Sequence, residues 1–204
     1  WQGNADVSMT RTEIVRHVIE HSALAAHRHV FGVVAWFSLL AAVGLGPVGA
    51  LLFRLSALLF NAWGEHKPLA ADDGPHISEA LQSVSASAWY RVDWLPARLT
   101  GLSFAVVGNF EDAVDAWRQQ SDQFQHPNDG VVLAATSGAI NVRLGGAVAG
   151  SESTEPDDIS DMVPPTAGRE PEFAHLRSMV GLVWRAVVMW MVLLALLTLA
   201  RLVG

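Results

Sequence analysis

The sequence contains no cysteine, a single tyrosine and few charged residues, and the lack of cysteine excludes several kinds of site. Without cysteine the chain can form no disulfide, no thiolate nucleophile and no cysteine-ligated zinc site. Its net charge of -7 disfavours nucleic acid as a partner. Of the 204 residues 51% are hydrophobic and only 16% charged, and eight are tryptophans, which suit the boundary between hydrocarbon and water. The composition therefore predicts an integral membrane protein.

The start of the chain also lacks a signal-peptide pattern, and its first residue is Trp1 rather than methionine. We expect the chain to be incomplete at its N-terminus. Any count of membrane spans is then a lower bound.

A helix is expected over residues 10–26, because Thr10 and Glu13 have the spacing of a capping box and an apolar periodic pattern follows. Glu13, His17 and His21 share one face of this helix, with Glu20 beside them. Such a face is either a metal site or solvated. The solvated face is favoured, because the sequence has no HExxH pattern.

Residues 30–53 carry no charge and are long enough to cross the roughly 30 Å hydrocarbon layer. The run is interrupted by GLGPVG at 44–49, and apolar character continues after Arg54 to residue 63. The pattern predicts a hairpin of two shorter helices at 30–63. Arg54 is then either an arginine at the membrane boundary, which is favoured, or an anchor for an anionic ligand.

The middle of the chain predicts shorter helices. A polar stretch at 64–75 leads into a short helix at 78–88, and the apolar residues 99–110 are too few to cross a bilayer and predict a packed or interfacial helix. The pattern then indicates an amphipathic helix at 111–125 with Trp117 on its apolar side, a loop at 125–130, and a segment of small residues at 129–146 that allows close helix packing.

An acidic, proline-rich loop at 151–172 separates this first part from a C-terminal transmembrane helix at 173–204. Within residues 180–199 only Arg185 is charged, and it lies near the start, where its side chain can reach the headgroups. The predicted fold class is all-α. The predicted domains are a helical membrane-associated domain at 1–150, the loop, and the terminal span.

The orientation follows from the arginines that precede each apolar run. These are Arg11, Arg16 and Arg28 before the first run, and Arg169, Arg177 and Arg185 before the last. Both starts are assigned to the cytoplasm, so the hairpin must enter and leave on the same face.

Three motifs carry a resemblance to a known family: GPVGALLFR at 46–54, DWLPARLT at 93–100 and NVRLGG at 141–146. Together they resemble the CobD/CbiB family of polytopic inner-membrane proteins. The resemblance implies a role in cobalamin biosynthesis, where enzymatic members join an aminopropanol unit to a corrinoid carboxylate in the adenosylcobinamide phosphate step.

The sequence departs from the enzymatic members at two places. Where they carry Glu-Asn-x-x-Asp, residues 20–29 read EHSALAAHRH, and where they carry an Asp-Asp pair and an Asn before Pro-Ala-Arg, this chain has Trp89, Tyr90 and Asp93. The hairpin motif is also similar to AmpE, an inner-membrane protein linked to β-lactamase induction. Two functions therefore stay open: an amide-forming corrinoid synthase, and a non-catalytic AmpE-like sensor or scaffold.

The candidate ligand-binding residues are Arg54, Asp93, Arg98 and Arg143. Asp93 and Arg98 either pair across a helical turn or bind separately. Arg143 either clamps an anion beside Gly145 and Gly146 or belongs to a close helix contact. His27 and His29, at the membrane boundary, are expected to be solvated.

The sequence identifies no catalytic residue, metal site or cofactor. The predicted partners are the lipid bilayer, a corrinoid or other anionic small molecule, and a second copy of the chain or another membrane protein.

Overall fold

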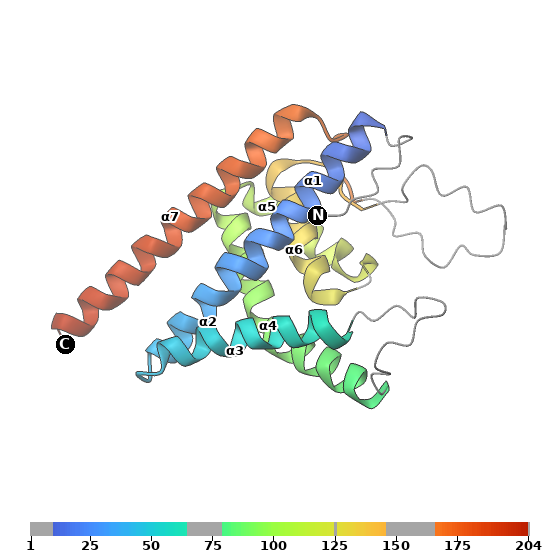
Figure 1. Cartoon of the computed structure of the whole chain (residues 1–204). Coiled ribbons are helices and arrows are strands. Elements are labelled where there is room, and N and C mark those ends of the chain that lie inside the picture. The colour runs from blue at the N-terminus through green and yellow to red at the C-terminus, as the bar shows by residue number, and fades with distance from the viewer. Residues whose placement is uncertain (1–9, 65–78, 125, 146–165, 204) are drawn as a thin grey trace. The chain divides into compact units, whose positions relative to one another are not determined.

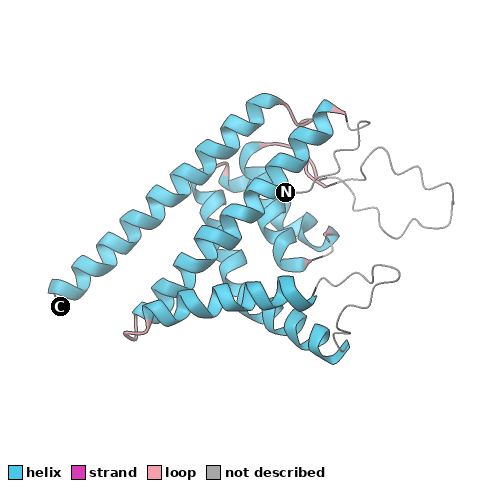
Figure 2. Cartoon of the chain, viewed as in Figure 1, coloured by secondary structure: helices cyan, strands magenta, loops and turns pink. Residues whose placement is uncertain are grey.

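The computed structural model describes residues 10–64, 79–124, 126–145 and 166–203. Regular structure in these ranges is helical (Figures 1 and 2), apart from an isolated parallel bridge between Val142 and Arg169. The all-α prediction is confirmed. The chain divides into two compact units, a hairpin unit, His27–Leu99, and a terminal unit, Trp1–Ala26 with Thr100–Gly204.

Three helices in the described ranges are long and apolar enough to cross a membrane: Arg11–Ala41, Gly46–Trp63 and Phe173–Val203. This confirms the prediction of a helical membrane protein with a C-terminal span. The first of them consists of α1 (Arg11–Ala26), a π-helical turn η1 (His27–Phe31) and α2 (Gly32–Ala41).

The capping box at the start of α1 forms as predicted. The backbone N–H of Thr10 donates to Glu13 Oε2 at 2.7 Å, and the N–H of Glu13 donates to Thr10 Oγ1 at 3.4 Å. The helix does not end near Ala26, however, but continues through η1. A π-turn holds an extra residue, so the helix stays continuous while the set of residues that face inward changes.

The predicted hairpin is confirmed: α2 is followed by a turn and then by α3 (Gly46–Leu59), which continues into η2 (Phe60–Gly64). The turn depends on Gly44, whose φ of 83° lies in the region that favours glycine. Pro47 follows in the first turn of α3, where its missing N–H has no helical partner to lose. A side chain at Gly49 would meet the backbone carbonyl of Trp36, so this glycine lets the two helices approach closely.

One long helix, α4 (Glu79–Val107), replaces the two shorter ones expected at 78–88 and 99–110. The helix passes through Pro96, which cannot donate to the carbonyl of Val92 four residues earlier. That carbonyl instead accepts a hydrogen bond from the indole N–H of Trp36 on α2, at 2.9 Å. The partner lost to proline is therefore supplied by another helix of the hairpin unit.

In the terminal unit, α5 (Phe110–Gln120) is the predicted amphipathic helix, and Asn109 caps it by accepting from the N–H of Asp112. A 3-10 turn η3 (Ser121–Gln123) follows, and then α6 (Pro127–Ile140). The predicted loop at 125–130 is wrong for residues 127–130, because Pro127 begins α6 with a backbone angle suited to a helix start. A side chain at Gly138 would meet the backbone of Asp112 and Ala113, so α6 packs closely on α5, as its small residues predict.

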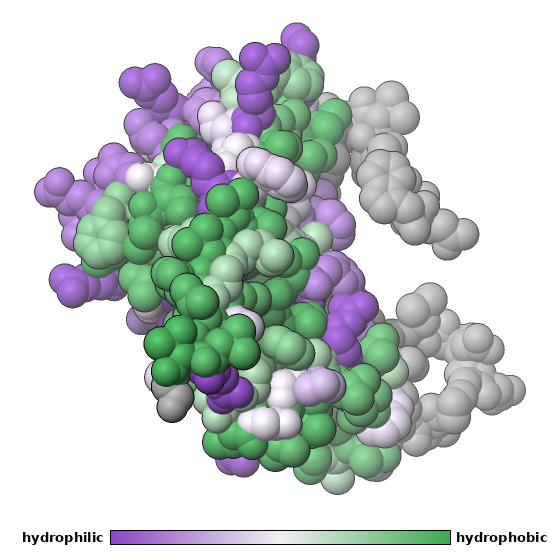
Figure 3. All heavy atoms as spheres, turned by 90° about the vertical axis from the view of Figure 1, so that its left-hand side faces the viewer, coloured by the Kyte–Doolittle hydropathy of each residue, from purple (hydrophilic) through white to green (hydrophobic). Residues whose placement is uncertain are grey.

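The final helix, α7 (Phe173–Val203), buries Met179, Leu182 and Ala186 and leaves most of its other large side chains exposed. Much of the surface drawn in Figure 3 is hydrophobic, as expected for side chains that a bilayer covers. The predicted polar stretch at 64–75 and acidic loop at 151–172 lie largely outside the described residues.

Candidate functional site

The hairpin unit contains a fully buried histidine–aspartate pair. His27 comes from the π-turn η1 and Asp93 from the middle of α4, and His27 Nε2 lies 2.9 Å from Asp93 Oδ1. Both side chains have an exposed fraction of 0%. Buried polar side chains need hydrogen-bond partners, and breaking this pair would leave a buried charge without one, at a cost of about 3 to 5 kcal/mol.

Aromatic rings surround this pair. The Phe53 ring lies edge-on to His27 with centroids 6.4 Å apart, and it also contacts Trp89 at 5.3 Å. Trp89 in turn stacks on Phe60 at 5.8 Å. The expectation that His27 is solvated is therefore wrong, because the π-turn carries it into this aromatic core.

The second carboxylate oxygen of Asp93, Oδ2, is also buried, and among the described residues it accepts no hydrogen bond. A buried carboxylate oxygen that accepts no hydrogen bond attracts nearby donors strongly, because the interior of the protein has a low dielectric constant and solvates the oxygen poorly. Asp93 thus combines a structural bond to His27 with an unused acceptor atom.

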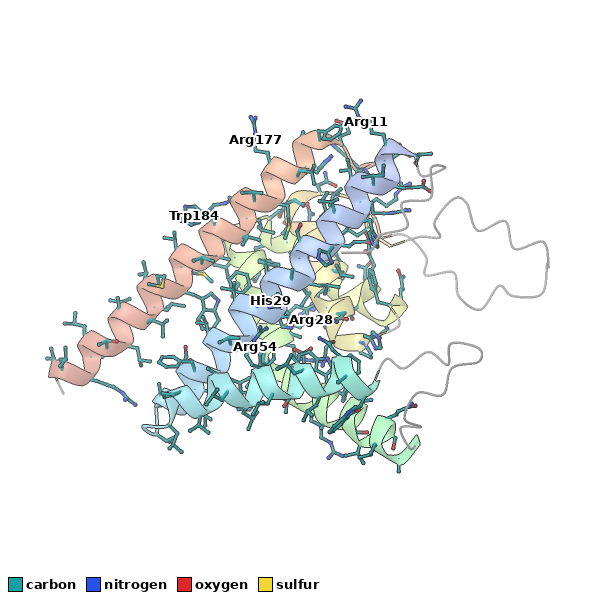
Figure 4. The ribbon with its side chains drawn as sticks, viewed as in Figure 1. Arg11, Arg28, His29, Arg54, Arg177 and Trp184 are labelled. Atoms are coloured by element: carbon teal, nitrogen blue, oxygen red, sulfur yellow. The ribbon has the colours of Figure 1, made fainter. Side chains whose placement is uncertain are left out.

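Arg54 and His29 lie on the exposed side of the hairpin unit. Arg54 Nη1 donates to His29 Nδ1 at 2.7 Å, which requires that nitrogen to be unprotonated (Figure 4). Both side chains are exposed, so the pair is accessible. A guanidinium has five N–H donors, and the others can meet a carboxylate or phosphate. Either interpretation of Arg54 fits this geometry, and its ligand role stays a prediction.

The sequence left Asp93 and Arg98 either paired or separate; the structure shows Asp93 bonded to His27 and Arg98 in contact with Trp94. Arg98 donates from Nη1 to the carbonyl of Trp94 at 2.9 Å, and its guanidinium lies over the Trp94 ring, 4.1 Å from the centroid. Burial lowers the pKa of Arg98, while Tyr90 and Asp93 act in the opposite direction. Arg98 is thus held flat against an exposed indole.

Arg143 belongs to the terminal unit, in the segment after α6. Its side chain is exposed, and its backbone N–H donates to the carbonyl of Arg169 at 2.7 Å. The adjacent Gly145 is held from both sides by α1: its N–H donates to Glu20 Oε1 at 2.7 Å, and its carbonyl accepts from Arg16 Nη1 at 2.9 Å. The carboxylate that approaches this glycine is therefore the protein's own Glu20, and Gly146 lies outside the described residues.

The polar residues of α1 fall into two groups, exposed histidines and glutamates that bond to other parts of the protein. His17 and His21 are exposed, as a solvated face predicts, while Glu13 serves in the cap and Glu20 in the contact with Gly145. In the described ranges, no three histidine, aspartate or glutamate side chains come together as metal ligands.

The sequence analysis missed the roles of His27, Glu20 and Arg16. A signal for the burial of Asp93 was present, since Trp89, Asp93 and Ala97 recur every four residues and all are buried in α4. No comparable local signal marks His27, whose direction depends on the π-turn.

These features are those of a polytopic helical membrane protein with a buried polar pair in its hairpin unit. The model of the CobD/Cbib protein family matches residues 5–183, and the chain belongs to that family.

Two curated relatives carry the name cobalamin biosynthesis protein CobD. The protein of Stutzerimonas stutzeri (strain A1501) is 29% identical over 167 residues, which cover 81% of this chain and 48% of the relative. The protein of Chromobacterium violaceum is 32% identical over 135 residues, which cover 65% of this chain and 38% of the relative. The chain thus spans about half the length, or less, of these relatives. No solved structure matches it. The similarity to AmpE stays a prediction.

Proposed function

We propose that this chain is part of an inner-membrane protein of cobalamin biosynthesis. The observation that carries the proposal is the family match over residues 5–183, supported by relatives named for that pathway. The resemblance of its motifs implies the step in which an aminopropanol unit is joined to a corrinoid carboxylate.

The hairpin unit supplies groups suited to an anionic corrinoid. Arg54 with His29 presents charged and polar hydrogen-bonding groups, and Arg98 on the Trp94 ring pairs a cation with an apolar surface. Charge-assisted hydrogen bonds from arginine to carboxylate are among the stronger polar contacts in proteins. Arg143 offers a further exposed guanidinium in the terminal unit.

The test is complementation of a bacterial strain that lacks its own corrinoid-linking enzyme. The full-length gene is expected to restore cobalamin synthesis, and Arg54→Gln to reduce it at least tenfold while the membrane level of the protein is unchanged. Arg118→Gln, an exposed arginine of α5 outside the proposed site, is the matched control and is expected to complement fully. Equal complementation by both variants would remove Arg54 from the site.

A non-catalytic, AmpE-like scaffold or sensor is the second candidate, and one observation favours it. Activating a carboxylate for amide formation usually needs several acidic groups to hold a metal-bound nucleotide. Asp93 is committed to His27 through one oxygen, and the described residues gather no set of three metal-ligating side chains. Failure of the unaltered full-length gene to complement, with insertion into the membrane verified, would favour this candidate.

The orientation of the chain and its assembly with other copies remain predictions. The cytoplasmic assignment of both span starts is supported by Arg11, the first residue of α1, and by Arg177, which precedes the apolar part of α7.

A further inference from the structure

An apolar groove runs between α1 and α7 in the terminal unit. It has a volume of about 500 Å³ and is lined on one side by Val18, Ser22 and Ala26 and on the other by Met179, Val180 and Trp184. Val180 and Trp184 are 70% and 69% exposed, an unusual extent for such large apolar side chains.

Basic side chains lie at one end of this groove. Arg11 begins α1, and its guanidinium lies 4.2 Å from the centroid of the Phe173 ring, at the start of α7. Arg177 lies on the same face of α7 as Val180 and Trp184, at helical spacings of three and seven residues. Figure 4 shows Arg11 and Arg177 toward the N-terminal ends of their helices, with Trp184 farther along α7.

A smaller cavity of about 330 Å³ lies at this basic end, between Arg11, Val15 and Phe173. Glu172 also lines it, so one acidic group offsets part of the positive charge. Arg185 adds a further cation: its Nε donates to the carbonyl of Gly181 at 3.2 Å, which directs the side chain back toward the basic end. That direction is the one a membrane arginine takes to reach the headgroups.

We propose that the α1–α7 groove binds one anionic phospholipid of the surrounding bilayer. The acyl chain lies along Val18, Ala26 and Val180, and the phosphate is held between Arg11 and Arg177. A lipid is the fitting occupant because α7 is a membrane span with only 6% of its apolar window buried, so the groove opens toward hydrocarbon. The charge at its end selects a negative headgroup.

The test is native mass spectrometry of the purified full chain with added phosphatidylglycerol or phosphatidylcholine. One phosphatidylglycerol is expected to bind tightly, and phosphatidylcholine at least tenfold more weakly. Because a surface arginine near an anionic lipid contributes a factor of about five, Arg11→Gln with Arg177→Gln should weaken phosphatidylglycerol binding by roughly 30-fold. Arg118→Gln on α5 is the charge-matched control and is expected to bind as the unaltered chain does. If the double variant does not fold, Arg177→Gln alone keeps the contact between Arg11 and Phe173 and should weaken binding about fivefold.

A second variant separates a lipid in the groove from a headgroup on the surface. Ala26→Leu, at a position of α1 that lines the groove, fills the open space and should displace both lipids, whereas Val188→Leu, an exposed position of α7 outside the groove, should not. Inorganic phosphate at millimolar concentration should leave phosphatidylglycerol bound. Equal affinity for the two lipids, unchanged binding in the arginine variants, or unchanged binding in Ala26→Leu would each overturn the proposal.

Discussion

Helices α6 and α7 both lack a distinct polar face, yet α6 is surrounded by protein and α7 is largely exposed. Every residue of α6 from Asn128 to Ala139 is buried, whereas α7 buries Met179, Leu182 and Ala186 and exposes most of its large side chains. The 14 residues of α6 reach only about 21 Å, too short for the hydrocarbon layer, and the 31 residues of α7 exceed it.

Side-chain size accounts for the rest of the difference. Glycine, alanine, serine and threonine in α6 let the backbone of α5 approach, while leucine, valine and methionine in α7 present bulk to lipid. Whether an apolar helix packs inside the protein or faces the bilayer therefore depends on its length and on the size of its side chains, since neither helix has a distinct polar face.

The sharpest way to break this comparison is one substitution made in both helices. Gly138→Leu places a side chain on the backbone of Asp112 and Ala113, which cannot rotate away, and should cost more than about 4 kcal/mol of unfolding free energy. Gly181→Leu meets open space and should cause no loss of stability, because it also removes a glycine from the interior of the helix. Thermal unfolding in detergent, followed by circular dichroism, measures both. Similar losses in the two variants would contradict the assignment of α7 to lipid.

The same comparison of buried and exposed positions can be made for polar side chains, with the buried pair of the hairpin unit. His27→Leu leaves the buried Asp93 without its partner and should cost about 3 kcal/mol in the same assay. His17→Leu, at a side chain that is 74% exposed, is the control and should have little effect. Adding Asp93→Leu to His27→Leu should restore much of the loss, because two apolar groups need no partner. No recovery would mean that the pair is held by more than its mutual hydrogen bond.

A leucine pair tests the comparison without adding bulk. Leu133 of α6 is 6% exposed, so Leu133→Ala should cost about 2 kcal/mol or more through lost contacts and a cavity. Leu196 of α7 is 57% exposed, and Leu196→Ala should cost less than about 0.5 kcal/mol. Chemical denaturation of detergent-solubilised protein gives both values. A larger loss at Leu196 would place α7 against protein instead of lipid.

The smallest expected effect concerns the proline in α4. Trp36→Phe removes the donor to the Val92 carbonyl and should cost about 1 to 2 kcal/mol. In a Pro96→Ala background the helix can satisfy that carbonyl itself, so the same substitution should cost less. A double-mutant cycle measures the difference, and strict additivity would show that the indole does not compensate for the proline.

Local signals predicted much of the fold. The capping box at Thr10, the break at Gly44 and Pro47, and the long apolar run before Leu199 each act within a few residues and are confirmed by the helix bounds. The continuation of α4 through Pro96 could not be predicted, because it depends on Trp36, sixty residues earlier in the sequence.

The candidate site was less accessible to sequence reasoning for the same reason. The sequence singled out Arg54 and Asp93, but the partners His29 and His27 come from another helix of the hairpin unit. The role of Glu20 at Gly145 likewise joins residues 125 positions apart. Charge type and position can be recognised in a sequence, whereas the pairing of distant charges needs coordinates.

Several hydrogen bonds tie the segment after α6 to the segment before α7. Leu144 and Thr166 exchange two hydrogen bonds of 2.7 Å, from the N–H of Thr166 to the Leu144 carbonyl and from the N–H of Leu144 to Thr166 Oγ1. Both residues are buried, so these two segments are fixed to each other within the terminal unit. Doubling the length of chain between them would cost only about 0.6 kcal/mol in closure entropy. A fluorescent protein or affinity tag inserted between residues 146 and 165 should therefore be carried without disturbing the helices on either side.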